Sequence, residues 1–103
     1  MGKYGYHGQL KAKNGHAEKL AGLLLQASKL VRSANGCSMY IVSKDHSDKN
    51  VIWVTEVWDT KEDHDNSLKL DPVKALIMQA MPLIDGQPQK GQELEVLGGL
   101  GID

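Results

Sequence analysis

Residues 51–58 read VIWVTEVW and carry the clearest structural signal in this chain. β-Branched and aromatic residues fill the stretch, which is typical of a β-strand. Successive residues of a strand face opposite sides of its sheet. Both sides of this strand are apolar, with Val51, Trp53 and Val57 on one and Ile52, Val54 and Trp58 on the other. Such a strand is buried on both sides, so its sheet needs a layer of structure against each face.

A second strand is predicted immediately before this one. Cys37 to Lys44 is again rich in β-branched and aromatic residues. The polar linker from Asp45 to Asn50 suits a hairpin turn between the two strands. We therefore expect them to pair antiparallel.

The N-terminal part of the chain predicts a strand followed by a helix. Tyr4 to Lys13 alternates as a strand does, with Tyr6 and Leu10 on the same face. From Ala17 to Ala34, apolar residues recur every three or four positions, which indicates one long amphipathic helix. Asn35-Gly36 supplies the left-handed conformation that ends such a helix.

The C-terminal part predicts a second helical stretch and a last strand. Thr60 can cap the helical stretch, with Asp63 three residues on. The stretch is interrupted near Asp71-Pro72, where proline suits a first turn, and Met81-Pro82 closes it. Glu93 to Leu97 then reads as a strand.

The predicted order of elements is β-α-β-β-α-β, an α+β ferredoxin-like arrangement that we expect to form one domain of residues 1–103. It gives a four-stranded antiparallel sheet with two helices on one face. The other face, which carries Trp53, stays uncovered, and the simplest second layer is the sheet of another copy. We therefore expect a homodimer, with the glycine-rich tail from Gly98 to Asp103 reaching the partner subunit.

Composition excludes several classes of protein. The chain has 12 Lys and Arg against 13 Asp and Glu, without the basic stripe that nucleic-acid binding requires. The single cysteine, Cys37, permits no internal disulfide and no CxxC pair, which suits a reducing compartment. No apolar stretch approaches the roughly 20 residues of a membrane span, and the first residues do not read as a leader. We expect a cytoplasmic protein that binds neither nucleic acid nor membrane.

Glu56 and His64 are the residues with useful acid–base chemistry. Glu56 faces the same side of its strand as Trp58, and a buried carboxylate must be paired or have a raised pKa. The alternative is a salt bridge to a lysine at the end of the sheet. His64 follows the same strand, and with an ordinary pKa of about 6.5 it takes up a proton near neutral pH, its ring oriented by Asp65 or Glu56. The alternative is a histidine that caps its helix or packs on it.

Four short segments, taken together with their order along the chain, carry a resemblance to a known protein family. They are residues 10–15 (LKAKNG), 35–37 (NGC), 55–58 (TEVW) and 61–65 (KEDHD). Together they resemble the antibiotic biosynthesis monooxygenase family, and the likeness covers nearly the whole chain. The resemblance implies a dimeric α/β barrel with a small-molecule pocket between the sheet and the helices of each protomer.

The resemblance also implies roles for particular residues in that pocket. It puts Trp58 there as a wall on which a planar substrate stacks, the alternative being a core aromatic. His64 is then the catalytic base, and Glu56 its orienting or proton-relaying partner. Tyr6 and Met78 complete the expected substrate-binding residues.

The expected function is a cofactor-independent monooxygenase that uses molecular oxygen to oxidise a quinol or another phenolic small molecule. Neither a metal-ligand spacing nor a dinucleotide or phosphate-loop motif is present, so we expect no cofactor and no metal. The alternative is a non-catalytic small-molecule binding or detoxification protein. The likeness to haem-degrading relatives puts their pocket asparagine at Gly8 and their iron-binding histidine at Ile77, so we expect no tight haem binding.

Overall fold

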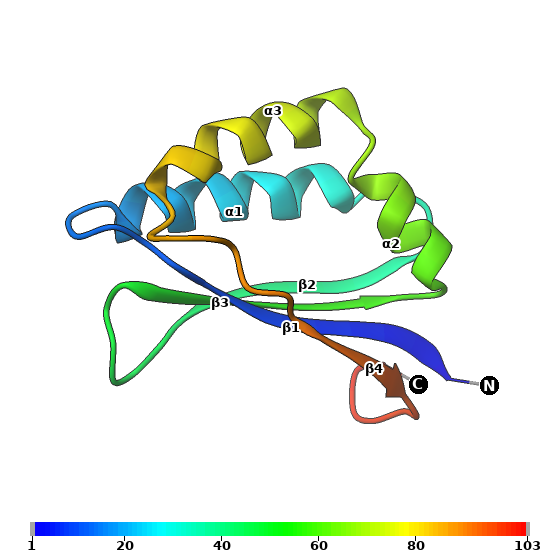
Figure 1. The fold of residues 1–103 in the computed structure, drawn as a ribbon. Helices are drawn as coiled ribbons and strands as arrows, with labels where there is room; N and C mark the ends of the chain where they lie inside the picture. The colour runs from blue at the N-terminus through cyan, green and yellow to red at the C-terminus, as the bar shows by residue number, and fades with distance from the viewer. Residues whose placement is uncertain (1, 103) are drawn as a thin grey trace.

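Three helices lie over one face of a four-stranded antiparallel sheet in the computed structural model, which describes residues 2–102 (Figure 1). The strands, in the spatial order β2-β3-β1-β4, are β2 (Cys37–Lys44), β3 (Val51–Trp58), β1 (Lys3–Lys11) and β4 (Gln92–Val96). The helices are α1 (Ala17–Val31), α2 (Lys61–Ser67) and α3 (Asp71–Ala80), and a 3-10 turn at Met81–Leu83 follows α3. This confirms the expected α+β ferredoxin-like arrangement.

The central hairpin has the predicted bounds, and β1 and α1 are shorter than expected. β1 ends at Lys11, although Ala12 still forms an isolated bridge with Ile84. α1 ends at Val31, not near Ala34, because the chain turns there and Gly36 adopts a φ of 82°. That left-handed residue directs its carbonyl to Asp59, whose N–H donates to it at 2.8 Å.

The second helical stretch divides into α2 and α3. The Thr60 hydroxyl accepts a hydrogen bond from the backbone N–H of Asp63 at 3.0 Å, which confirms the predicted N-cap. A turn after Ser67 separates the two helices, and Pro72 lies in the first turn of α3. As a result α2 closes one end of the sheet and α3 runs beside α1 above it (Figure 1).

The register of the sheet determines which side chains meet below the helices. In β3, Glu56 is paired with Tyr6 of β1 on one side and with Tyr40 of β2 on the other. A β-bulge between Cys37 and Met39 shifts the pairing of β2 by one residue. Beyond the bulge, alternate residues of β2 again face the helices.

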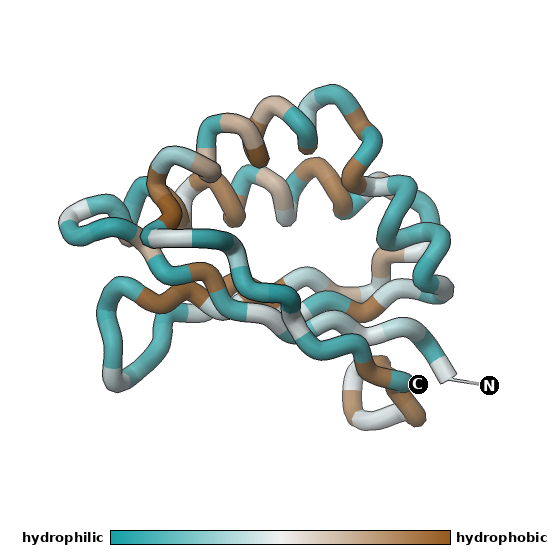
Figure 2. The backbone as a smooth tube through the Cα atoms, viewed as in Figure 1, coloured by the Kyte–Doolittle hydropathy of each residue, from teal (hydrophilic) through white to brown (hydrophobic). Residues whose placement is uncertain are grey.

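The hydrophobic core fills the space between the sheet and the helices. In Figure 2 hydrophobic and hydrophilic residues alternate along α1 and α3, as expected of helices that bury one side. Leu20 and Ile52 are fully buried in the larger cluster, and Trp58 is fully buried in a smaller one with Val31 and Val73. Burying each such aliphatic side chain contributes about 1.5–3 kcal/mol.

In the part of the chain that the structure describes, the opposite face of the sheet carries no helix (Figure 1). Trp53 and His7 point to this side, where their rings stack at 4.8 Å and 10°. His7 Nδ1 lies 3.0 Å from the Thr55 hydroxyl, and the Trp53 indole N–H donates to Asp45 at 2.9 Å. Within residues 2–102, no helix is both long enough and apolar enough to cross a membrane.

Candidate functional site

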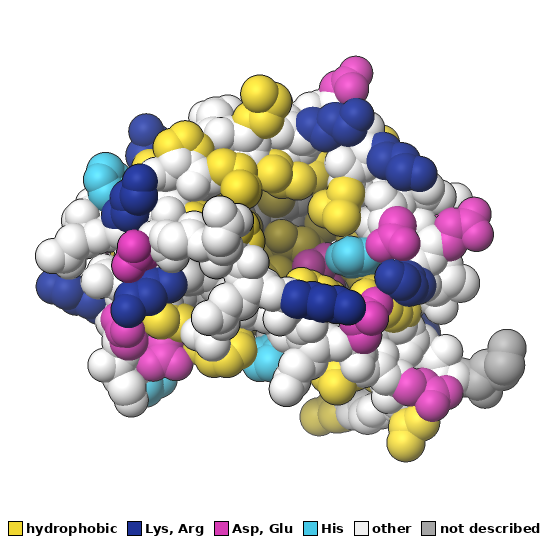
Figure 3. Space-filling view, viewed as in Figure 1, with side chains coloured by type: hydrophobic (Ala, Val, Ile, Leu, Met, Phe, Trp, Pro, Cys, Tyr) yellow, Lys and Arg dark blue, Asp and Glu magenta, His cyan; other side chains and the backbone are white. Residues whose placement is uncertain are grey.

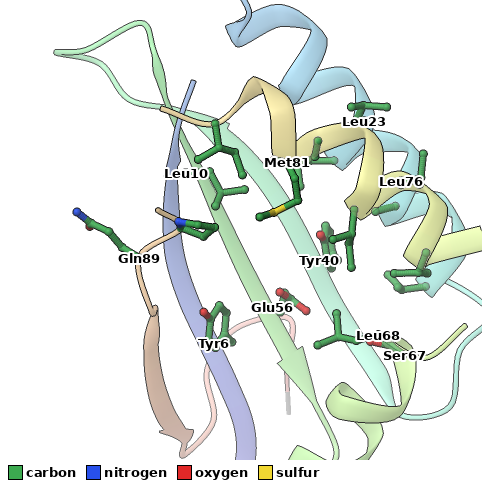
Figure 4. Close-up of a pocket in the computed structure, with 18 residues that line it drawn as sticks. Tyr6, Leu10, Leu23, Tyr40, Glu56, Ser67, Leu68, Leu76, Met81 and Gln89 are labelled. Atoms are coloured by element: carbon green, nitrogen blue, oxygen red, sulfur yellow. The ribbon is translucent and has the colours of Figure 1, made fainter. Parts of the chain in front are cut away.

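A cavity of ≈ 370 Å³ lies between the sheet and the helices. Figure 3 shows it as a hollow on one face of the molecule, with hydrophobic side chains inside it. Leu23 of α1 and Leu76 of α3 lie on its helical side, and Leu10 lies on the sheet side (Figure 4). Its walls are therefore suited to an apolar molecule.

Polar groups enter this cavity mainly from one row of the sheet. Tyr6, Glu56 and Tyr40 project from β1, β3 and β2 at matched register positions (Figure 4). Among the described residues that line the cavity, Glu56 is the only charged one. Burial raises the pKa of Tyr40, so its hydroxyl stays neutral and is able to donate a hydrogen bond. The row thus offers one carboxyl group between two phenols.

The Glu56 carboxyl is held from behind by Trp58. The indole N–H of Trp58 donates to Oε1 of Glu56 at 2.9 Å. Burial raises the pKa of Glu56, while the Trp58 hydrogen bond and the nearby His64 oppose that rise. Glu56 is consequently a stronger base than an exposed glutamate.

His64 lies in α2 directly beside this carboxyl. Its Nε2 atom is 3.8 Å from Oε1 of Glu56, and its Nδ1 atom is 2.9 Å from Oδ1 of Asp65. The ring stacks against Tyr6 at 5.4 Å and meets Trp58 edge-on at 6.0 Å. His64 is not among the residues that line the cavity, but Tyr6 and Glu56, which it contacts, both are.

The structure brings four of the five expected site residues together. Tyr6 and Glu56 line the cavity, and His64 and Trp58 support them. Trp58 is 0 % exposed and does not line the cavity, so the expected stacking wall is wrong and the core alternative holds. An alternating strand pattern gives the face on which a side chain lies but not its depth.

Met78 lies outside the group. Its side chain is 74 % exposed on the outer side of α3 and does not line the cavity, so its expected position is wrong. The buried positions of α3 are Val73, Leu76 and Ala80. Met78 lies between Leu76 and Ala80 in the sequence, but helix periodicity puts its side chain on the exposed side of α3. The methionine that lines the cavity is Met81, at the start of the 3-10 turn.

Two parts of the site were not expected from the sequence. Tyr40 lies opposite Glu56 because the register of the β2–β3 hairpin pairs them, and alternation within a single strand does not reveal that register. The segment before β4 also reaches the cavity, where Pro88 and Gln89 line it. The backbone N–H of Gly91 donates to the Tyr6 hydroxyl at 2.8 Å, and this contact fastens the segment to β1.

The surface beside His64 carries a compact set of ion pairs. Lys61 lies 3.1 Å from Glu93 and 3.8 Å from Asp65. The Tyr4 hydroxyl donates to Glu93 at 2.9 Å, and the Tyr4 ring lies 5.3 Å from that of His64. These contacts tie α2 to β1 and β4 at the end of the cavity. Residues 2–102 contain no group of three His, Cys, Asp or Glu side chains that could hold a metal ion.

Comparison with known proteins gives consistent matches. A family model described as antibiotic biosynthesis monooxygenase matches residues 4–78. A solved structure from Chloroflexus aurantiacus, assigned to that class of protein, is 36% identical, with 98% of this chain and 99% of that chain covered and a TM-score of 0.87. A similarly assigned protein from Deinococcus radiodurans is 28% identical over 97% and 96% of the two chains, with a TM-score of 0.74.

Similarity of fold extends to more distant sequences. A Nitrosomonas europaea structure with 13% identity has a TM-score of 0.88 over 94% of this chain and 93% of that chain. At this level of identity the match concerns the fold alone. No curated protein matches this sequence.

Proposed function

Since the chain belongs to the antibiotic biosynthesis monooxygenase family, we propose that it is a cofactor-independent monooxygenase that oxidises a quinol or another phenolic small molecule. The observation that carries this proposal is the Glu56 carboxyl, the one charged group in the described lining of an otherwise apolar cavity. A phenol that enters such a cavity directs its hydroxyl to the carboxyl and its ring to the apolar walls.

The reaction begins with removal of the phenolic proton. The resulting anion passes one electron to dioxygen, and the phenoxyl radical and superoxide combine at a ring carbon that carries hydrogen. The peroxide takes back the proton, and loss of water breaks its O–O bond and the C–H bond at that carbon. One oxygen atom ends in the quinone carbonyl and the other in water, so no external reductant is needed.

We assign proton removal to Glu56 and His64 acting as a pair. Glu56 lines the cavity and contacts the bound phenol, and its pKa is raised by burial. His64 lies behind it, within 3.8 Å, and exchanges the proton. Catalytic hydrogen bonds are often long without substrate and shorten in the complex. Tyr6 and Tyr40 are the neighbours whose hydroxyl groups orient the phenol.

Oxygen consumption with a panel of quinols tests the proposal. We expect His64→Ala and Glu56→Gln each to reduce turnover by about a hundredfold to ten-thousandfold, the usual contribution of a positioned base. His16→Ala, which removes an exposed histidine, is the matched control and should leave turnover unchanged. If quinols raise the melting temperature but no oxygen is consumed, the protein is a small-molecule binder and the monooxygenase proposal is wrong.

We further propose that the helix-free face of the sheet packs against the same face of a second copy. Ile41 and Leu94 are exposed there, beside the stacked Trp53 and His7. Such a cluster of apolar side chains on a sheet supports a partner layer. Light scattering should give the mass of a dimer at micromolar concentration, and a monomer would contradict this assignment.

A further inference from the structure

We propose that Asp65 is a positioning residue, which holds His64 in one tautomer so that a proton taken up by Glu56 passes to His64 Nε2. The inference rests on the proposed function for the origin of that proton. The arrangement of the three side chains is a property of the folded chain and is testable without any substrate.

The contact between Asp65 and His64 fixes where the imidazole proton lies. Oδ1 of Asp65 is 2.9 Å from Nδ1 of His64. An ionised carboxylate only accepts hydrogen bonds, so Nδ1 carries the proton. The hydrogen bond to His64 is the main cause that lowers the pKa of Asp65, and Lys61 adds to it, so Asp65 stays ionised. The neutral ring then presents an unprotonated Nε2 to Glu56.

This contact is not a default of helix geometry. Adjacent residues in a helix point in directions about 100° apart and do not normally face each other. His64 and Asp65 are adjacent, yet their side chains meet at hydrogen-bond distance. The ring is also fixed on other sides, by Tyr6 at 5.4 Å and by Trp58 at 6.0 Å. His64 is therefore held in an orientation that serves both of its nitrogen atoms.

The other polar groups around His64 are directed to other partners, so Asp65 is the hydrogen-bond partner of Nδ1. From β1, the Tyr4 hydroxyl is directed to Glu93, and the Tyr6 hydroxyl accepts from Gly91. From β3, Glu56 faces Nε2. The cation of Lys61 lies between the carboxylates of Glu93 and Asp65, and so offsets their negative charge.

Exposure increases along the three side chains from the cavity carboxyl to the surface. The Glu56 side chain is 10% exposed and that of His64 is 11% exposed, whereas that of Asp65 is 48% exposed. The separation of 3.8 Å between Glu56 and His64 must shorten by about 1 Å for a direct transfer, as catalytic contacts do when substrate binds. The buried carboxyl is thus connected through one imidazole to the surface of the protein.

The test is nitrogen NMR of the His64 ring in the full-length protein. In the wild type we expect the neutral ring to carry its proton on Nδ1. In Asp65→Ala the proton should move to Nε2, because the acceptor at Nδ1 is gone. Glu62→Ala is the matched control, since it removes one exposed carboxylate from the same helix, and it should keep the wild-type tautomer.

Two results would overturn the proposal: a wild-type ring protonated on Nε2, or an unchanged tautomer in Asp65→Ala. The first measurement needs no variant, so it decides even if the variant does not fold. In the oxygen assay, Asp65→Ala should lower kcat at least tenfold with little change in KM. If no oxygen is consumed by any variant, the monooxygenase proposal fails while the tautomer experiment still decides the role of Asp65.

Discussion

Replacing Trp58 with Phe is the most direct test of how the cavity carboxyl is held. The change removes the indole N–H that donates to Glu56 at 2.9 Å, together with two ring carbons of a side chain that is fully buried. The lost carbons cost about 1.6 kcal/mol at about 0.8 kcal/mol each. The hydrogen bond is worth about 1.5–3 kcal/mol to an ionised carboxylate but only about 0.5–1.5 kcal/mol to a neutral acid.

The loss of stability should therefore depend on pH. Below the Glu56 pKa we expect Trp58→Phe to cost about 2–3 kcal/mol, and above it about 3–5 kcal/mol. The Trp58 hydrogen bond lowers the Glu56 pKa, so its removal raises that pKa further. The variant's folded state then binds more protons over this range, and its stability falls faster as the pH rises. Urea unfolding from pH 5 to 9, followed by circular dichroism at one protein concentration, measures the difference.

Trp53→Phe is the matched control for this experiment. The Trp53 indole N–H also donates to a carboxylate, that of Asp45, at 2.9 Å. This hydrogen bond is the main cause that lowers the pKa of Asp45, which is therefore ionised throughout the range tested. The free-energy difference for Trp53→Phe should not vary with pH. A pH-independent difference for Trp58→Phe as well would refute the reasoning about Glu56.

Three further predictions concern the cavity. Burial raises the pKa of Glu56 in the folded state. The stability that comes from its protonated form is therefore complete below the unfolded-state pKa and is lost as the pH rises through the folded-state pKa. In urea unfolding, Glu56→Gln should have the same free energy of unfolding as the wild type at acidic pH and a higher one at alkaline pH. A Cβ at position 91 would lie 2.6 Å from Cζ of Tyr6, so Gly91→Ala should displace that ring and weaken naphthol binding in calorimetry more than it lowers the melting temperature. Met81→Ala should weaken the same binding because Met81 lines the cavity, whereas Met78→Ala, on the exposed side of the helix, should bind naphthol as the wild type does.

The sequence predicts the sheet well because its signals are local. β-Branched composition gives the bounds of β2 and β3, and the Thr60 cap and Pro72 give the starts of α2 and α3. The end of α1 is predicted less well, since the apolar pattern continues past Val31 into the turn that returns the chain to the sheet.

The sequence predicts a site residue correctly where strand alternation alone determines which way its side chain points. It does not do so where the position depends on the depth of a side chain or on the rotation of a helix about its axis. Tyr6 and Glu56 follow from strand alternation, and both line the cavity. Trp58 is on the predicted face of β3, but it is fully buried and donates to the Glu56 carboxyl instead of lining the cavity. The alternation of a strand carries no information on how deeply a side chain is buried. Met78 depends on the rotation of α3 about its own axis, which the packing of Leu76 against the core fixes.

The bulge in β2 has a consequence for changes in chain length. Cys37 and Tyr40 are three residues apart, yet both pack against the Trp58 cluster, because Ser38 is the extra residue between them. Deleting Ser38 would leave a regular strand in which Tyr40 still pairs with Glu56. Deleting one residue between Tyr40 and Lys44 would instead move the rest of β2 to the opposite face of the sheet. A change in strand length at the bulge therefore leaves the cavity intact, whereas a change between Tyr40 and Lys44 does not.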